Sequence, residues 1–152
     1  MSARERLAEL GLALPAVVAP MAAYVPAVQT GNLVYISGQL PFVDSELPAI
    51  GKVGGQVTAE DAHGYARTCA LNALAAIDAL VGIDSVVRVV KVVGFVSSAE
   101  GFAGQPAVVN GASELLGEVF GDAGRHARSA IGVAELPLGA PVEIELVVEV
   151  AP

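Results

Sequence analysis

The chain has 152 residues, of which 54% are apolar and 16% charged, with a net charge of −8 and a pI of about 4.6. This length suits one domain with a proper core, so we expect a single domain over residues 1–152. A nucleic-acid-binding surface is basic, so the acidic balance speaks against a nucleic-acid ligand. The apolar share is high for a monomer and indicates that part of the surface faces other subunits.

The cysteine and hydropathy content indicate a cytoplasmic protein. Cys69 is the only cysteine, which excludes an intrachain disulfide and a cysteine-based zinc site. The opening "MSARERLAEL" is charged and lacks the apolar core of a secretory signal. The most apolar run, 86–96, contains two cations and is too short to span a bilayer. We therefore expect no membrane segment.

The first third of the chain predicts a short helix, a hairpin and a loop. "SARE" at 2–5 is a capping box that starts a helix ending near Gly11, and an extended lead-in follows to about residue 20. Residues 23–29 and 33–37 are strand-like on either side of the turn "TGNL". Residues 40–55 are rich in Gly and Pro and predict a loop.

The rest of the chain predicts two long helices and three strands. Thr58 caps a helix that ends at Gly82, and Pro106 begins a second that ends at Gly121. The apolar stripes of the two helices are 62, 66, 69, 70, 73, 77 and 80, and 108, 112, 115 and 119. The β-branched run at 86–97 predicts a buried strand, and strands are also expected at 127–135 and 142–150.

The order β-β-α-β-α-β-β predicts an α+β fold. Its simplest packing is one sheet with both long helices on one face. The opposite sheet face then stays apolar and uncovered, which again predicts an oligomer built around the sheets.

Arg128 is unusual because it lies at the start of an apolar, strand-like run. On a strand, Arg128, Ala130, Gly132 and Ala134 share one face, since side chains alternate between faces. The small side chains beside the arginine leave room for a ligand or for a neighbouring subunit.

The last strand places Glu143, Glu145 and Glu149 on one face. An exposed acidic face is the simplest interpretation, and we adopt it for Glu145 and Glu149. We expect the Glu143 strand to return along the Arg128 strand as a hairpin. Glu143 is then either the salt-bridge partner of the arginine or a catalytic acid or base.

The remaining reactive side chains give weaker signals. Neither His63 nor His126 has a second ligand at metal spacing, so no metal site is expected. His63 is expected at the surface, and His126 shares the neighbourhood of Arg128. Cys69 lies on a helical apolar stripe and is expected in the core. Tyr24 is compatible with simple hairpin packing.

Three segments resemble the RidA/YjgF family of reactive-intermediate deaminases. They are "SGQLP" at 37–41, "ARSAIGVAELP" at 127–137 and "VEIE" at 142–145, and the resemblance runs from about Tyr24 to the C-terminus. The N-terminal helix and "NGAS" resemble a YjgF-like branch. The resemblance implies a chorismate-mutase-like fold and a homotrimer with ligand clefts between subunits. It also implies cofactor-free hydrolysis of enamines and imines, such as 2-aminoacrylate, to 2-oxo acids and ammonia.

The resemblance also assigns roles to individual residues. Arg128 matches the arginine that binds the substrate carboxylate, and Glu143 matches the glutamate that positions or activates water. Tyr24 matches the tyrosine at the mouth of the cleft. Ser37 and Gly38 match the segment that lines the pocket.

Two further positions match the family less well. Asn110 matches a helix asparagine of the family after a one-residue shift. Ala130 stands where the founding branch has a cysteine, which widens the pocket and removes a thiol. Two alternatives therefore stay open: a non-catalytic, small-carboxylate-binding or regulatory protein with the same cleft, and another reaction in the same fold.

Overall fold

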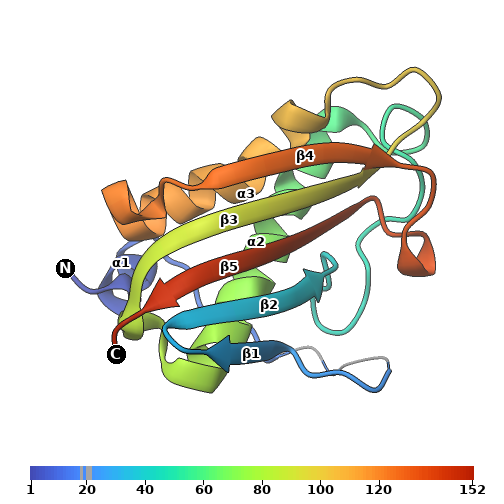
Figure 1. Ribbon diagram of the computed structural model, residues 1–152. Coiled ribbons are helices and arrows are strands. Elements are labelled where there is room, and N and C mark those ends of the chain that lie inside the picture. Colours follow the sequence, from blue (N-terminus) through green and yellow to red (C-terminus); the bar gives the residue numbers. More distant parts are fainter. Residues whose placement is uncertain (18, 20–21) are drawn as a thin grey trace.

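A computed structural model describes residues 1–17, 19 and 22–152, and it contains one five-stranded mixed sheet (Figure 1). The strands lie in the order β1 (Ala27–Thr30), β2 (Leu33–Gln39), β5 (Val142–Val150), β3 (Val86–Ser97) and β4 (Ala127–Val133). The helices are α1 (Ala3–Glu9), α2 (Ala59–Val81) and α3 (Gln105–Phe120). Figure 1 shows α2 and α3 on the same face of the sheet, so the predicted α+β packing is confirmed.

The helix boundaries follow the capping residues. The Ser2 hydroxyl accepts from the Glu5 amide (3.1 Å), and the Glu5 carboxylate accepts from the Ser2 amide (2.9 Å), which confirms the capping box. At the start of α2 the Thr58 hydroxyl accepts from the Asp61 amide (3.1 Å), and Gly82 ends the helix with a φ of 81°. The predicted stripe on α2 is wrong at its last position, because Leu80 is 47% exposed.

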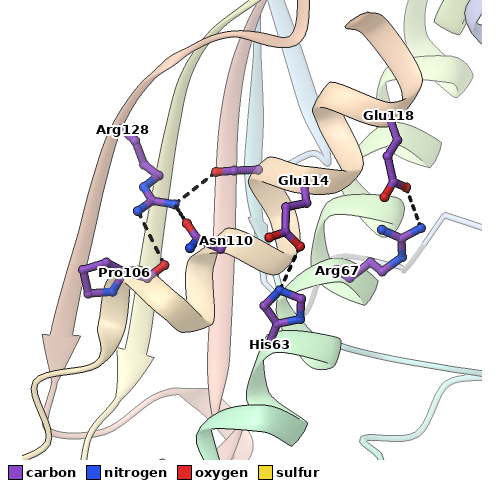
Figure 2. Close-up of polar contacts among 8 residues, drawn as sticks. His63, Arg67, Pro106, Asn110, Glu114, Glu118 and Arg128 are labelled. Carbon is purple, nitrogen blue, oxygen red and sulfur yellow. Dashed lines mark hydrogen bonds and ion pairs between the residues drawn. The ribbon is translucent and has the colours of Figure 1, made fainter.

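The two long helices pack with their backbones in close contact. A Cβ at Gly111 of α3 would overlap the backbone carbonyl oxygen of His63 on α2. On the outer side, the His63 ring lies 3.0 Å from the Glu114 carboxylate, as Figure 2 shows. Gly111 therefore sets both the distance and the register of α3 on α2.

The core lies between the helices and one face of the sheet. Alternate residues of β5 point into it and are buried: Val142, Ile144, Leu146, Val148 and Val150. Within the described part of the chain, no helix lies over the opposite face, and Val28, Tyr35 and Ile131 on that face are about half exposed. The uncovered apolar face expected from the sequence is therefore present, and the oligomer that would cover it stays a prediction.

The predicted hairpin between the last two strands is wrong. β3 lies between them, parallel to β4 and antiparallel to β5. The reason is the crossover through α3, which places β4 on the outer side of β3 and makes it the edge of the sheet. The chain then passes the end of β3 through a short 3-10 turn, Pro137–Gly139, to reach β5.

Two strand ends also differ from prediction. The first strand begins at Ala27 instead of residue 23, directly after Pro26, which has no N–H to give to a ladder. β4 ends at Val133 instead of residue 135. Residues 23–26 lie outside β1, although the Pro26 carbonyl oxygen accepts from the Ser37 amide of β2 (2.9 Å), and Tyr24 and Pro26 form part of the pocket wall described below.

Candidate active site

Arg128 lies on the edge strand β4 and is held by one side of α3 (Figure 2). Its Nη1 donates to Oδ1 of Asn110 (2.7 Å) and to the hydroxyl of Ser113 (3.2 Å). Its Nη2 donates to the carbonyl oxygen of Pro106 at 3.5 Å. Asn110 and Ser113 are three residues apart, which places both on the same face of the helix.

The strand register places Arg128 on the helix-covered face of the sheet. Arg128 pairs with Val92, which is fully buried under the helices. The predicted alternation along β4 is therefore correct. The predicted free space is partly filled, because the amide of Gln105 and the hydroxyl of Ser98 lie close to Gly132.

Glu143 lies on the other face of the sheet. It pairs with Phe95 on β3 and not with a residue of β4. A Cβ at Gly38 would overlap Oε2 of Glu143, so the carboxyl occupies space that any other residue at 38 would take. Burial raises the pKa of Glu143, and the negative charge of Glu145 raises it further.

A pocket of about 570 Å³ lies beside the Glu143 carboxyl. Four of the residues expected at a site line it: Tyr24, Ser37, Gly38 and Glu143. The apolar part of the wall comes from Ala19, Ala22, Pro26, Leu40, Phe42 and Pro137. The hydroxyl of Ser37 donates to the carbonyl oxygen of Val25 (2.6 Å) and so ties the segment before β1 to β2.

The expected site residues thus form two groups on opposite faces of one sheet. We call Arg128, Asn110 and Ala130 the arginine half-site, and Glu143, Tyr24, Ser37 and Gly38 the glutamate half-site. The structure brings the members of each half-site together. It does not bring Arg128 and Glu143 to one cavity within a single chain, because the sheet separates them.

Ser113 and Asn72 contribute to these half-sites and were missed by the sequence reasoning. Ser113 follows Asn110 by three residues, a spacing that could have revealed it. Asn72 is buried on α2 and donates to the carbonyl oxygens of Leu40 (3.0 Å) and Phe42 (3.1 Å), so it holds the pocket wall. A single amide in the apolar run "CALNALAA" was its signal.

The other reactive side chains lie outside the pocket. The ring of His126 contacts Ser113 (2.9 Å) and reaches Arg128 only through that hydroxyl. His63 is on the outer helix layer, as expected. Cys69 is fully buried, as expected, and burial, followed by the charge of Glu143, raises its pKa.

Residues 1–17, 19 and 22–152 contain no group of three His, Cys, Asp or Glu side chains that could hold a metal ion. Within the same ranges, every helix is too short or too polar to cross a membrane. The cytoplasmic location stays a prediction.

Comparison with known proteins identifies the family. Residues 15–150 match the family model described as Endoribonuclease L-PSP. The chain belongs to this family. Its structural relatives include YjgF and RidA proteins, and the α+β fold is theirs. The L-PSP match covers both half-sites and every strand of the sheet.

Individual L-PSP relatives resemble the chain to different degrees. Protein TCP17 of Trypanosoma cruzi is 44% identical over 145 residues, which cover 94% of this chain and 91% of its own. The crystal structure of Atu1372 from Agrobacterium tumefaciens, a protein of unknown function, is 44% identical with a TM-score of 0.90 and covers 98% of this chain and 92% of its own. RidA from the Antarctic bacterium Psychrobacter is 30% identical with a TM-score of 0.63, and the match covers 88% of this chain and 94% of its own. The chain is thus closer in shape to Atu1372 than to that RidA.

Proposed function

We propose that the protein hydrolyses reactive enamines and imines, of the 2-aminoacrylate type, to 2-oxo acids and ammonia. The reaction takes place in clefts between the subunits of a homotrimer. Membership of a family that includes RidA supports this proposal. The observation that carries it is the division of the site: a carboxylate-binding cation and a raised-pKa acid lie on opposite faces of one sheet. A second copy is needed to bring them to one ligand.

Arg128 binds the substrate carboxylate in this proposal. A guanidinium is planar, always charged and able to bind a carboxylate through two parallel hydrogen bonds. Asn110 and Ser113 accept from Nη1, and the Pro106 carbonyl oxygen accepts one hydrogen of Nη2 at 3.5 Å. Nε and the second hydrogen of Nη2 are then available to the ligand. Lysine, a point charge on a flexible stem, would not replace it well.

Glu143 acts as the acid and base. Glu143, as the carboxylic acid, gives a proton to the terminal carbon of the enamine CH₂=C(NH₂)COO⁻, which becomes an iminium ion. Glu143, now a carboxylate, accepts a proton from water while the water oxygen bonds to the C=N carbon, and it then gives this proton to the nitrogen. As the C–N bond breaks, Glu143 takes the proton of the hydroxyl, so that ammonia leaves, a 2-oxo acid forms and Glu143 is protonated again. Burial raises the pKa of Glu143, which makes the protonated form easier to reach than in an exposed glutamate.

The residues that line the two half-sites limit which substrate the protein can use. Leu40 and Phe42 are apolar, and Ala130 stands in the arginine half-site where the founding branch has a cysteine. The absence of that thiol is the specific observation that favours the second candidate, a protein that binds small carboxylates without turning them over.

Subunit mixing tests the proposal. Arg128→Ala and Glu143→Gln are each expected to lose about 100-fold in activity when enzymatically generated 2-aminoacrylate is the substrate. After joint refolding in equal amounts, about a quarter of clefts between copies contain both wild-type side chains, so activity returns to about that fraction of wild type. Recovery supports the shared cleft, and the absence of recovery contradicts it. Calorimetric binding of pyruvate to wild type without any turnover would instead select the second candidate.

A further inference from the structure

We infer that Ser113 and His126 are positioning residues for Arg128. With Gly124 they form a hydrogen-bonded positioning network, Gly124–His126–Ser113–Arg128, that fixes which edge of the guanidinium faces a ligand. This inference rests on the proposed carboxylate-binding role of Arg128. No element of the network belongs to the residues that the resemblance assigned, apart from Arg128 itself.

The donors and acceptors of the network have one consistent arrangement. Arg128 has only N–H donors, so the Ser113 oxygen accepts from Nη1 (3.2 Å). The Ser113 hydrogen then needs an acceptor, and Nε2 of His126 lies 2.9 Å away. Nδ1 of His126 lies 2.6 Å from the carbonyl oxygen of Gly124, which can only accept. All three bonds form when His126 is neutral with its hydrogen on Nδ1.

The far end of the network is closely packed. Gly124 closes the 3-10 turn Gly121–Gly124 and is buried. A Cβ at Gly124 would overlap the carbonyl oxygen of Leu116, which lies on α3 one turn after Ser113. The residue whose carbonyl oxygen fixes the His126 tautomer therefore packs against the same helix that carries Ser113.

The network determines the orientation of Arg128. The two hydrogens of Nη1 are accepted by Asn110 and Ser113, both on α3. Nη2 gives one hydrogen to the Pro106 carbonyl oxygen at 3.5 Å, and its second hydrogen lies beside the Nε hydrogen, so these two parallel N–H groups have the geometry that a carboxylate accepts bidentately. Without the Ser113 hydroxyl, the guanidinium keeps Asn110 and the long bond to Pro106 and is held less firmly.

NMR tests the network without any ligand. In wild type, ¹⁵N shifts are expected to show the His126 hydrogen on Nδ1, and the Arg128 Nη resonances are expected to be resolved because rotation is slow. Ser113→Ala averages the Nη resonances, and Ser113→Thr, which keeps a hydroxyl, restores them. A His126 hydrogen on Nε2 overturns the inference, because Ser113 would then accept from histidine.

Pyruvate affinity tests the consequence for the site. Ser113→Ala raises the Kd for pyruvate about tenfold, roughly 1.4 kcal/mol, and Ser113→Thr returns it to within about twofold of wild type. His126→Ala raises it about threefold, because the serine hydroxyl loses its acceptor. In imine hydrolysis, KM rises and kcat changes little, since Glu143 is untouched. Glu114→Gln is the matched control on the next position of α3, and it leaves the Kd unchanged because Glu114 pairs with His63.

The two proposals fail in different ways. If Arg128→Ala abolishes pyruvate binding while Ser113→Ala and His126→Ala bind like wild type, the positioning inference is overturned and the proposed function stands. If Arg128→Ala binds pyruvate like wild type, the proposed function fails. The tautomer and the Nη resonances then decide alone whether the network exists.

Discussion

The two half-sites prepare their charged groups by different means. In the arginine half-site, polar atoms of α3 hold the guanidinium through three hydrogen bonds. In the glutamate half-site, burial raises the pKa of the Glu143 carboxyl, and the missing side chain of Gly38 leaves it space. A guanidinium stays charged at any working pH, so the protein needs only to orient it. A carboxyl can gain or lose a proton, so its surroundings also set its chemistry.

The largest effect is expected from removing the oriented charge. Arg128→Ala should lower kcat/KM for 2-aminoacrylate by about 100-fold, roughly 2.7 kcal/mol, the loss of one or two charge-assisted hydrogen bonds. Arg128→Lys should lower kcat/KM nearly as much, because an ammonium group cannot form the two parallel hydrogen bonds of a guanidinium. Arg125→Ala is the matched control, since that side chain is 86% exposed. Wild-type rates in Arg128→Ala would remove this half-site from the mechanism.

The second-largest effect is expected in Glu143→Gln, which should change kcat and leave ligand affinity nearly unchanged. Glu143→Gln should lower kcat about 100-fold, the size of a general acid–base contribution, and leave the Kd for pyruvate within about twofold. Glu145→Gln should retain activity and shift the pH–rate profile to lower pH, because it removes a charge that raises the Glu143 pKa. A Glu143→Gln variant that loses pyruvate binding and keeps kcat would reverse the roles of the half-sites.

A single methyl group should disturb the glutamate half-site alone. In Gly38→Ala the new Cβ overlaps Oε2 of Glu143 and displaces the carboxyl, so kcat should fall about tenfold with little change in pyruvate affinity. Gly64→Ala makes the same change on α2, where nothing lies within 4 Å of the new Cβ, and should leave kcat unchanged. Equal kcat values in the two variants would mean that the Glu143 carboxyl accommodates the new methyl group without leaving its working position.

The smallest effect is on stability against pH. The folded chain binds the Glu143 proton more tightly than the unfolded chain, since burial raises that pKa. The free energy of unfolding should therefore decrease as pH rises from the usual range of a glutamate through the raised pKa. Glu143→Gln should flatten this decrease. Urea unfolding at a series of pH values measures it, and parallel curves for the two proteins would contradict it.

Short sequence motifs predicted the helices and strands well, but they did not predict the order of the strands in the sheet. Ser2, Thr58 and Gly82 cap or end helices as expected, because a cap depends on only a few neighbouring residues. The neighbour of β4 depends instead on where α3 returns the chain, which no residue between 134 and 141 encodes. The prediction of a hairpin between the last two strands therefore placed Glu143 beside Arg128, whereas β3 lies between their strands.

The site residues were predictable to a similar extent. Motif resemblance identified members of both half-sites, and strand parity gave the alternation around Arg128 correctly. Parity cannot tell which face a helix covers, so the separation of the half-sites needed the structure. Ser113 and Asn72 act through hydrogen bonds between distant segments, so the sequence indicates them only by the spacing of Ser113 from Asn110 and by the polarity of Asn72 in an apolar run.

The close backbone contact at Gly111 has a consequence for mutational tolerance. Because α3 meets α2 at this point through a glycine and a carbonyl oxygen, this contact does not depend on the identity of a large side chain. Substitutions on the outer surface of the helix pair should therefore accumulate with little effect on where Asn110 and Ser113 stand. A change at residue 111 would move both at once. Sequence change on the outer surface of the helix pair can thus leave the hydrogen bonds of Arg128 intact.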